Sequence, residues 1–193
     1  MPVEIARRRF DVDEYHRMGQ AGILSTEDRV ELIDGEIVAM TPIGARHNAA
    51  VNRANQALGR AVGDQAIVQI QGSIRLGRFS EPEPDVALLR PRDDFYASGL
   101  PGPVDVLLVI EMADASLAYD REVKSRLYAA AGIPEYWLVN LDARVVTCFL
   151  RPEGDVYQDL RQVPAGDSIA PDLLAACEVP AESLMDPRSG SAA

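Results

Sequence analysis

Hydrophobic and polar residues alternate with different periods along the first half of the chain, and each period predicts a particular secondary-structure element. Between residues 45 and 62, apolar side chains recur every three or four positions, which predicts an amphipathic helix. Residues 66–76 alternate apolar and polar side chains, which is typical of a strand. Residues 30–40 contain two short apolar segments on either side of Asp34 and Gly35, a pair that favours a tight hairpin turn.

The rest of the chain predicts a mixed α/β fold. The same patterns indicate further helices at 11–19 and 117–131, and strands at 85–90, 104–112, 136–140, 145–150 and 156–163. The strand at 104–112 is apolar on both faces, which places it in the middle of a sheet with helices on both sides. With the next helix and strand it forms a βαβ unit, whose crossover is expected to be right-handed. The predicted fold class is therefore α/β, a mixed sheet flanked by helices, with an N-terminal β-hairpin.

Chain length and charge set limits on the function. The 193 residues suggest one domain, which we place at residues 1–185, with a flexible tail at 186–193. The net charge is −11, from 19 basic and 30 acidic side chains. An acidic protein has no general attraction for a polyanion, so nucleic acid would bind only at a local basic patch or through bridging metal ions. This excludes avid, non-specific coating of DNA.

The cysteines and the N-terminal segment favour a cytoplasmic protein. Cys148 and Cys177 lie far apart in the sequence, and we expect reduced core residues rather than a disulfide or a zinc site. The N-terminal segment has no apolar stretch behind its arginines, so it does not resemble a secretory signal. The longest purely apolar run, 106–110, is too short to span a membrane.

Two acidic residues mark the ends of two predicted strands. Asp85 begins the strand at 85–90, and Glu111 lies near the end of the strand at 104–112. If these strands are antiparallel neighbours, both carboxylates lie at the same edge of the sheet. Charged groups there are costly unless they are paired or bind a metal, and two carboxylates on a rigid sheet suit Mg²⁺. The alternative is that each acid simply ends a strand in solvent.

A single lysine is the most unusual feature of the composition. Of the 19 basic residues, 18 are arginine and one is Lys124. Its retention suggests a position that needs a compact ammonium group, although chance is an alternative. The helical period predicts an inward stripe of Tyr119, Val123, Leu127 and Ala130. Asp120 and Lys124 lie on its flank. Either they form an ordinary helix ion pair, or Lys124 holds its ammonium group over the two strand carboxylates.

Three segments form a distinctive set of motifs in a fixed order: ELIDGEIVAMTPIGARH, EPEPDVALL and IEMADASLAYDREVKSRLYAAAGIPEYWLVN. Together they resemble the Uma-type family of putative restriction endonucleases, within the PD-(D/E)XK nuclease superfamily. The resemblance implies a restriction-endonuclease-like fold in which Asp85 and Glu111 hold Mg²⁺ or Mn²⁺ and the substrate is DNA. Ala113 stands where the common pattern has lysine, and Lys124 on the following helix then supplies the charge from another backbone position.

Four further polar residues are candidates for supporting roles: His47, Glu31, Gln71 and Asp120. His47 lies in the first turn of its predicted helix and faces inward, so it is either a core histidine or an acid-base group or phosphate ligand at the site. Glu31 in the first hairpin is either a third carboxylate or an exposed strand acid. Gln71 shares a predicted strand face with Gln69, and both are candidates to line the site.

The sequence supports two hypotheses about function. The first is a metal-dependent endonuclease in which Asp85 and Glu111 hold the metal and Lys124 assists the attacking water. A homodimer would suit cleavage of both DNA strands, although no feature of the sequence marks an interface. The second is a catalytically silent module of the same fold that binds nucleic acid or protein. Neither hypothesis involves a membrane.

Overall fold

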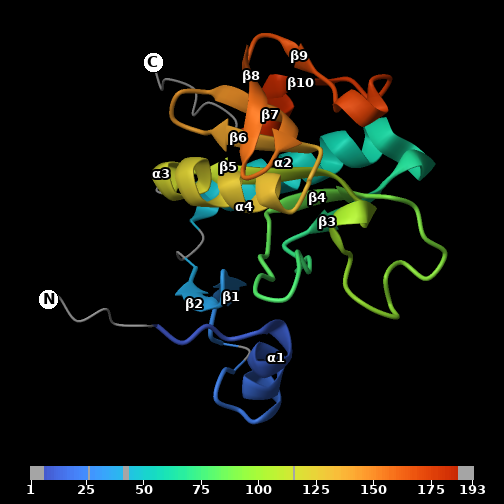
Figure 1. Ribbon diagram of the computed structural model, residues 1–193. Coiled ribbons are helices and arrows are strands. Elements are labelled where there is room, and N and C mark those ends of the chain that lie inside the picture. Colours follow the sequence, from blue (N-terminus) through green and yellow to red (C-terminus); the bar gives the residue numbers. More distant parts are fainter. Residues whose placement is uncertain (1–6, 26, 41–43, 115, 187–193) are drawn as a thin grey trace, which may run out of the picture.

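A six-stranded mixed sheet forms the centre of the molecule (Figure 1). The computed structural model describes residues 7–25, 27–40, 44–114 and 116–186. The strands are β3 (Ile67–Ile70), β4 (Val86–Leu89), β5 (Val106–Ala113), β6 (Glu135–Asn140), β7 (Val145–Glu153) and β8 (Val156–Pro164), in that spatial order. β5 and β6 run parallel, and the other neighbours are antiparallel. The predicted α/β class with a mixed sheet is confirmed.

Helices cover both faces of this sheet (Figure 1). On one face α2 (Ala45–Val62) packs Leu58 into a cluster that contains Trp137 of β6. On the other face the helical chain between β5 and β6 contributes Tyr128, which lies in a second cluster with Tyr136. β5 is buried along its whole length, as expected for a central strand. Among the described residues, no helix has the length and apolar composition needed to cross a membrane.

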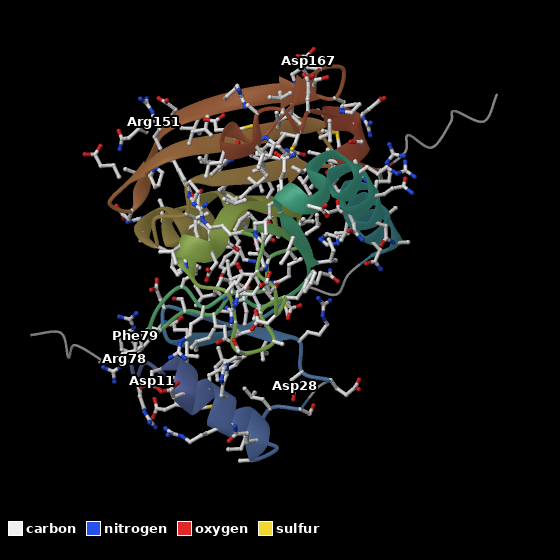
Figure 2. All side chains as sticks on the ribbon, turned by 90° about the vertical axis from the view of Figure 1, so that its right-hand side faces the viewer. Asp11, Asp28, Arg78, Phe79, Arg151 and Asp167 are labelled. Carbon is white, nitrogen blue, oxygen red and sulfur yellow. The ribbon has the colours of Figure 1, made fainter. Side chains whose placement is uncertain are left out.

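A helix and a hairpin form an N-terminal layer beside the sheet (Figure 1). This layer consists of α1 (Val12–Gln20), β1 (Val30–Ile33) and β2 (Glu36–Ala39). Asp11 caps α1 by accepting the backbone N–H of Glu14 at 2.9 Å, and it also pairs with Arg78 at 3.3 Å, a neighbourhood visible in Figure 2. The hairpin is the predicted one, and a bridge between Leu32 and Glu81 joins it to the segment before β4.

The strand predicted at 66–76 is shorter than expected. β3 ends at Ile70, because Gln71 has a φ of 46°, in the left-handed region that interrupts an extended chain. The side chain of Gln69 turns back onto the chain and donates to the carbonyl oxygen of Gly72 at 2.8 Å. The alternation of apolar and polar residues continues beyond this turn, so the pattern alone overestimated the length of the strand.

The helix predicted at 117–131 is interrupted by a π-helical turn. The chain forms α3 (Leu117–Tyr119), the π-helical segment η3 (Asp120–Lys124) and α4 (Ser125–Ala130). A π turn contains an extra residue, so it rotates the side chains that follow. The expected inward stripe is therefore wrong, since Val123 is 38% exposed and Ala130 is also exposed. The buried residues of this region are Asp120, Lys124, Ser125, Tyr128 and Ala129.

The C-terminal part of the described chain packs against α2. It contains β9 (Ser168–Ile169) and β10 (Val179–Pro180), and the short helices are η1 (Gly63–Gln65), η2 (Pro103–Asp105), η4 (Asp172–Leu174) and η5 (Ala181–Leu184). Asp186, the first residue of the expected tail, pairs with Arg46 of α2 at 3.3 Å, whereas residues 187–193 lie outside the described residues. Cys148 and Cys177 are free and buried, as predicted.

Candidate active site

The structure brings Asp85 and Glu111 together at one edge of the sheet. Asp85 directly precedes β4, and the antiparallel register pairs Val86 with Ile110, so Asp85 lies beside Glu111. The backbone N–H of Asp85 donates to Glu111 Oε2 at 3.3 Å. The backbone N–H of Met112 donates to Asp85 Oδ2 at 2.8 Å. The strand geometry that the sequence predicts for the two acids is therefore present.

Lys124 is buried against this pair. Its Nζ lies 2.9 Å from Glu111 Oε1 and 3.3 Å from Glu31 Oε2. Burial alone would lower the pKa of Lys124, but the carboxylates of Glu111, Glu31 and Asp120 raise it above its ordinary value, so the ammonium keeps its proton. Tyr128 donates its hydroxyl to the same oxygen of Glu111 at 2.7 Å. Burial raises the pKa of Glu111, and the charge of Lys124 opposes that rise.

Glu31 belongs to this cluster rather than to the solvent-facing side of the hairpin. The exposed-acid alternative is wrong, because Glu31 is only 3% exposed. Its Oε2 accepts the backbone N–H of Glu83 at 3.2 Å as well as the ion pair from Lys124. Glu83, which the sequence analysis missed, also lines the site, and burial raises its pKa while Arg29 opposes the rise.

His47 lies at the start of α2 and contacts Asp85. Its Nε2 is 2.9 Å from Asp85 Oδ2 and its side chain lines the cavity, so the structure places His47 at the candidate site. This hydrogen bond raises the pKa of His47, and burial opposes the rise. The ring nitrogen Nδ1 is buried and has no hydrogen-bond partner among the described residues. His47 and the backbone of Met112 together fix one oxygen of the Asp85 carboxylate.

The two remaining candidates also lie at the site, in different ways. Gln71 lines the cavity. Its predicted neighbour on the strand face, Gln69, does not line it and instead donates hydrogen bonds to the backbone of its own loop. Asp120 is buried and accepts the hydroxyl of Ser116. Burial raises the pKa of Asp120, and the Ser116 hydrogen bond opposes the rise. Of the two alternatives for Lys124, the Asp120–Lys124 helix pair does not form among the ion pairs of the described residues, since Lys124 pairs with Glu31 and Glu111.

These side chains surround a cavity of about 380 Å³ between the hairpin, the sheet edge and the π-helical turn. The acids that line it are Glu31, Glu83, Asp85, Glu111, Asp114 and Asp120, and the cations are Arg29 and Lys124. Arg29 forms no ion pair with the described residues, whereas Lys124 is paired with Glu31 and Glu111. An anionic substrate would therefore meet mostly negative charge unless a cation is added.

The carboxylate pair suits a hard divalent cation. Asp85 Oδ1 makes no hydrogen bond or ion pair with the described residues, and Glu111 Oε2 makes one hydrogen bond, at 3.3 Å. Nowhere in the described ranges do three or more side-chain ligands converge as a complete metal site. Mg²⁺ is commonly bound by one or two carboxylates, with water and phosphate oxygens in the other positions. The residues present fit such an ion.

Residues 12–182 match the family Uma2, described as putative restriction endonuclease. This match covers most of the chain. The chain belongs to the Uma2 family. The resemblance to this family that the sequence motifs indicate is thereby confirmed.

A solved structure agrees with the Uma2 fold. The crystal structure of a putative nuclease from Anabaena variabilis superimposes with a TM-score of 0.70, covering 91% of this chain and 97% of that chain at 17% sequence identity. At this identity the likeness establishes the fold. Among curated proteins, no match is found.

The site residues of this Uma2 member that the sequence did not single out include Glu83, Tyr128 and Arg29. Tyr128 lies four residues after Lys124, so the helical spacing from the lysine was an available signal for it. Glu83 is the second acid of the segment EPEPD, which ends at Asp85. Arg29 gave no such signal, because one arginine among many is not distinctive.

Proposed function

We propose that this Uma2 protein is a metal-dependent endonuclease that hydrolyses phosphodiester bonds in DNA. The observation that carries the proposal is the buried ion pair of Lys124 with Glu111, 2.9 Å long, beside Asp85 at the edge of the cavity. Burying an ammonium group requires strong compensation, and here the compensation comes from the acids best suited to hold a metal. The unusual lysine and the two strand acids therefore form one unit.

The bound metal, Mg²⁺ or Mn²⁺ held by Asp85 and Glu111, would supply an activated water and neutralise charge on the phosphate. The protein residues would position the reacting groups. Tyr128 and Lys124 fix the orientation of Glu111, and His47 fixes that of Asp85. The ammonium of Lys124 would donate to the attacking water or to the charge that develops on the phosphate oxygens.

Entry of DNA into an acidic cavity requires positive charge at its mouth. Arg29 precedes β1, and its carbonyl oxygen accepts the N–H of Met40 at 2.9 Å, which anchors its backbone to the hairpin. Arg29 is exposed and lines the cavity together with Glu83 and His47. We assign Arg29 to a phosphate of the bound strand, because guanidinium groups pair well with phosphate oxygens.

Plasmid cleavage tests the proposed activity. The protein is incubated with supercoiled plasmid and Mn²⁺, beside Asp85→Asn and Glu111→Ala. Glu122→Gln serves as the matched control, because Glu122 is an exposed acid of the same π-helical segment. We expect nicking by the wild type and the control, and none by the two site variants. Equal nicking by all four proteins would contradict the proposal.

Two measurements separate this proposal from the catalytically silent module. Calorimetry with Mg²⁺ and Mn²⁺ is expected to show binding that Asp85→Asn weakens, and a silent titration favours the module. Product analysis on plasmid and on single-stranded RNA shows which nucleic acid is cut. Linear product without prior nicks, together with a dimer in sedimentation, would support a homodimer that cuts both strands.

A further inference from the structure

One strained residue lies at the cavity, and the described chain shows why it is held there. Non-glycine residues with a left-handed φ are Asp34, Gln71, Phe95, Tyr96, Arg144 and Arg151. Of these, Gln71 lines the cavity. A left-handed conformation is uncommon for a residue with a side chain and persists where the surroundings impose it.

The loop after β3 fixes this conformation at three points. The carboxamide of Gln69 donates to the carbonyl oxygens of Gly72 at 2.8 Å and Ser73 at 3.3 Å. A Cβ atom on Gly72 would lie 2.7 Å from Gln69 Cδ, so a side chain at this position would displace the Gln69 carboxamide. The backbone N–H of Gln71 donates to the carbonyl oxygen of Asp85 at 3.1 Å, which ties the strained residue to the proposed metal ligand.

The side chain of Gln71 has no structural task among the described residues. Its carboxamide makes no hydrogen bond with them, whereas that of Gln69 makes two. The side chain is half-buried and lines the cavity beside the acids. The carboxamide therefore has two N–H donors and one acceptor without a partner among the described residues, at the lining of the cavity.

We propose that Gln71 is a substrate-contacting residue that donates its amide N–H to a phosphate oxygen of the nucleic acid strand. This inference rests on the proposed function. The sugar-phosphate backbone offers acceptors at each phosphate, and neutral amide side chains are common partners for them. A neutral donor also suits this position, because it adds no charge next to Asp85 and leaves the carboxylate pair free for a cation.

Two substitutions of Gln71 remove the donor, but only one of them relieves the backbone strain. Gln71→Gly relieves the left-handed strain, so its melting temperature should equal or exceed that of the wild type. Gln71→Glu keeps the length of the side chain and the strain but replaces the donor with an anion. Both variants should bind a fluorescent single-stranded oligonucleotide about 10- to 100-fold more weakly in the presence of Ca²⁺, since a hydrogen bond to a charged group is lost. Cleavage of the same oligonucleotide with Mn²⁺ should lose efficiency by a similar factor.

Arg151→Gly is the matched control. Arg151 has a φ of 56°, close to that of Gln71, and belongs to β7. Figure 2 shows it far from Asp11 and Phe79. Relieving its strain should leave oligonucleotide affinity and cleavage unchanged.

Each outcome decides between a substrate contact and a structural role. Wild-type affinity in both Gln71 variants overturns the inference, and so does a loss confined to Gln71→Gly, which would show that only loop rigidity matters. A clear fall in the melting temperature of Gln71→Gly also overturns it, because the side chain would then be structural. If the wild type binds the oligonucleotide but does not cleave it, the endonuclease proposal fails, and the Gln71 contact is still decided by the affinities. If the wild type neither binds nor cleaves, both fail.

Discussion

Two buried glutamates on neighbouring strands have opposite surroundings. Glu111 lies near the end of β5, and Glu135 begins the parallel strand β6, three positions before Leu138, the residue that pairs with Glu111. Glu111 is 4% exposed and Glu135 is 1% exposed. Burial raises the pKa of both carboxyl groups. By burial alone, the two residues are indistinguishable.

The hydrogen-bond and ion-pair partners of Glu111 and Glu135 distinguish the two residues. Glu135 accepts the indole N–H of Trp137 at 2.5 Å and the backbone N–H of Asp172 at 2.7 Å, both neutral donors, and it does not line the cavity. Glu111 is paired with the ammonium of Lys124, lines the cavity and lies beside Asp85. A buried acid that is satisfied by neutral donors joins parts of the fold. A buried acid with its own cation and access to a cavity is a candidate for chemistry.

The strongest test of this contrast is substitution of Lys124. Lys124→Met should reduce nuclease activity by about 10²–10³-fold, because a fixed donor to developing charge is lost. Lys124→Arg should also lose most activity, since the larger guanidinium does not fit between Glu111 and Glu31 in the same geometry. The measurements are plasmid cleavage rates and Mn²⁺ affinity, with a thermal melt to verify folding.

Mn²⁺ affinity shows whether Lys124 acts on the reaction step or on metal binding. Lysine is not a metal ligand, so Mn²⁺ should still bind to both folded variants. Arg126→Lys, on exposed Arg126 of α4, is the control that changes a cation of the same region and should keep full activity. Wild-type rates in both Lys124 variants would remove the lysine from the proposed mechanism.

In contrast to Lys124, Glu135 should affect stability but not activity. Glu135→Ala leaves two buried donors unpaired, which costs about 1–3 kcal/mol for each. Unfolding by urea measures this loss, and the cleavage rate of the folded variant should equal that of the wild type. A large loss of activity in folded Glu135→Ala would erase the distinction between the two glutamates.

The pH dependence of stability gives a second measure of Glu135. Because burial raises its pKa above the ordinary value of 4.5, the folded state binds the proton more tightly than the unfolded chain does. Its contribution to stability therefore falls as the pH rises from about 4.5 through the raised pKa. In Glu135→Gln this contribution is absent, so the stability of the variant relative to the wild type should increase over that interval. A constant difference across the interval would contradict the raised pKa.

The sequence could predict the parts of the site that depend on strand order. The positions of Asp85 and Glu111 follow from two short apolar strands, and antiparallel pairing brings their ends together. The rarity of lysine drew attention to Lys124 without any structural knowledge. The hairpin followed from the turn at Asp34 and Gly35.

The parts that depend on backbone irregularity could not be predicted. The π-helical turn moves Lys124 and Tyr128 inward, whereas the regular period placed Val123 there. The left-handed Gln71 ends a strand whose alternation continues past it. The burial of Glu31 depends on contact with Lys124, which is far away in the sequence. Local patterns carry no information about such long-range contacts.

Glu31 tests whether the lysine needs both of its carboxylate partners. Glu31→Gln removes one negative charge and leaves Glu111 in place, so the ammonium should stay charged but be held less firmly. We expect activity to fall by about tenfold, a smaller loss than for Lys124, in line with the value of one charge-assisted hydrogen bond. Because the backbone of Glu83 also donates to Glu31, a thermal melt must accompany the rate measurement. An unchanged rate would leave Glu111 as the sole functional partner of Lys124.

The smallest expected effect concerns Arg29 at the mouth of the cavity. If its guanidinium contacts a phosphate, Arg29→Ala should weaken DNA binding a few-fold, equally for all sequences, because phosphate contacts carry no base information. The slope of log affinity against log salt concentration should decrease by about one, since one fewer counterion is released. Arg17→Ala is the control, because Arg17 is an exposed arginine of α1 that does not line the cavity. Equal salt slopes for the wild type and both variants would contradict the assignment, and DNA entry would then depend on the added metal ion alone.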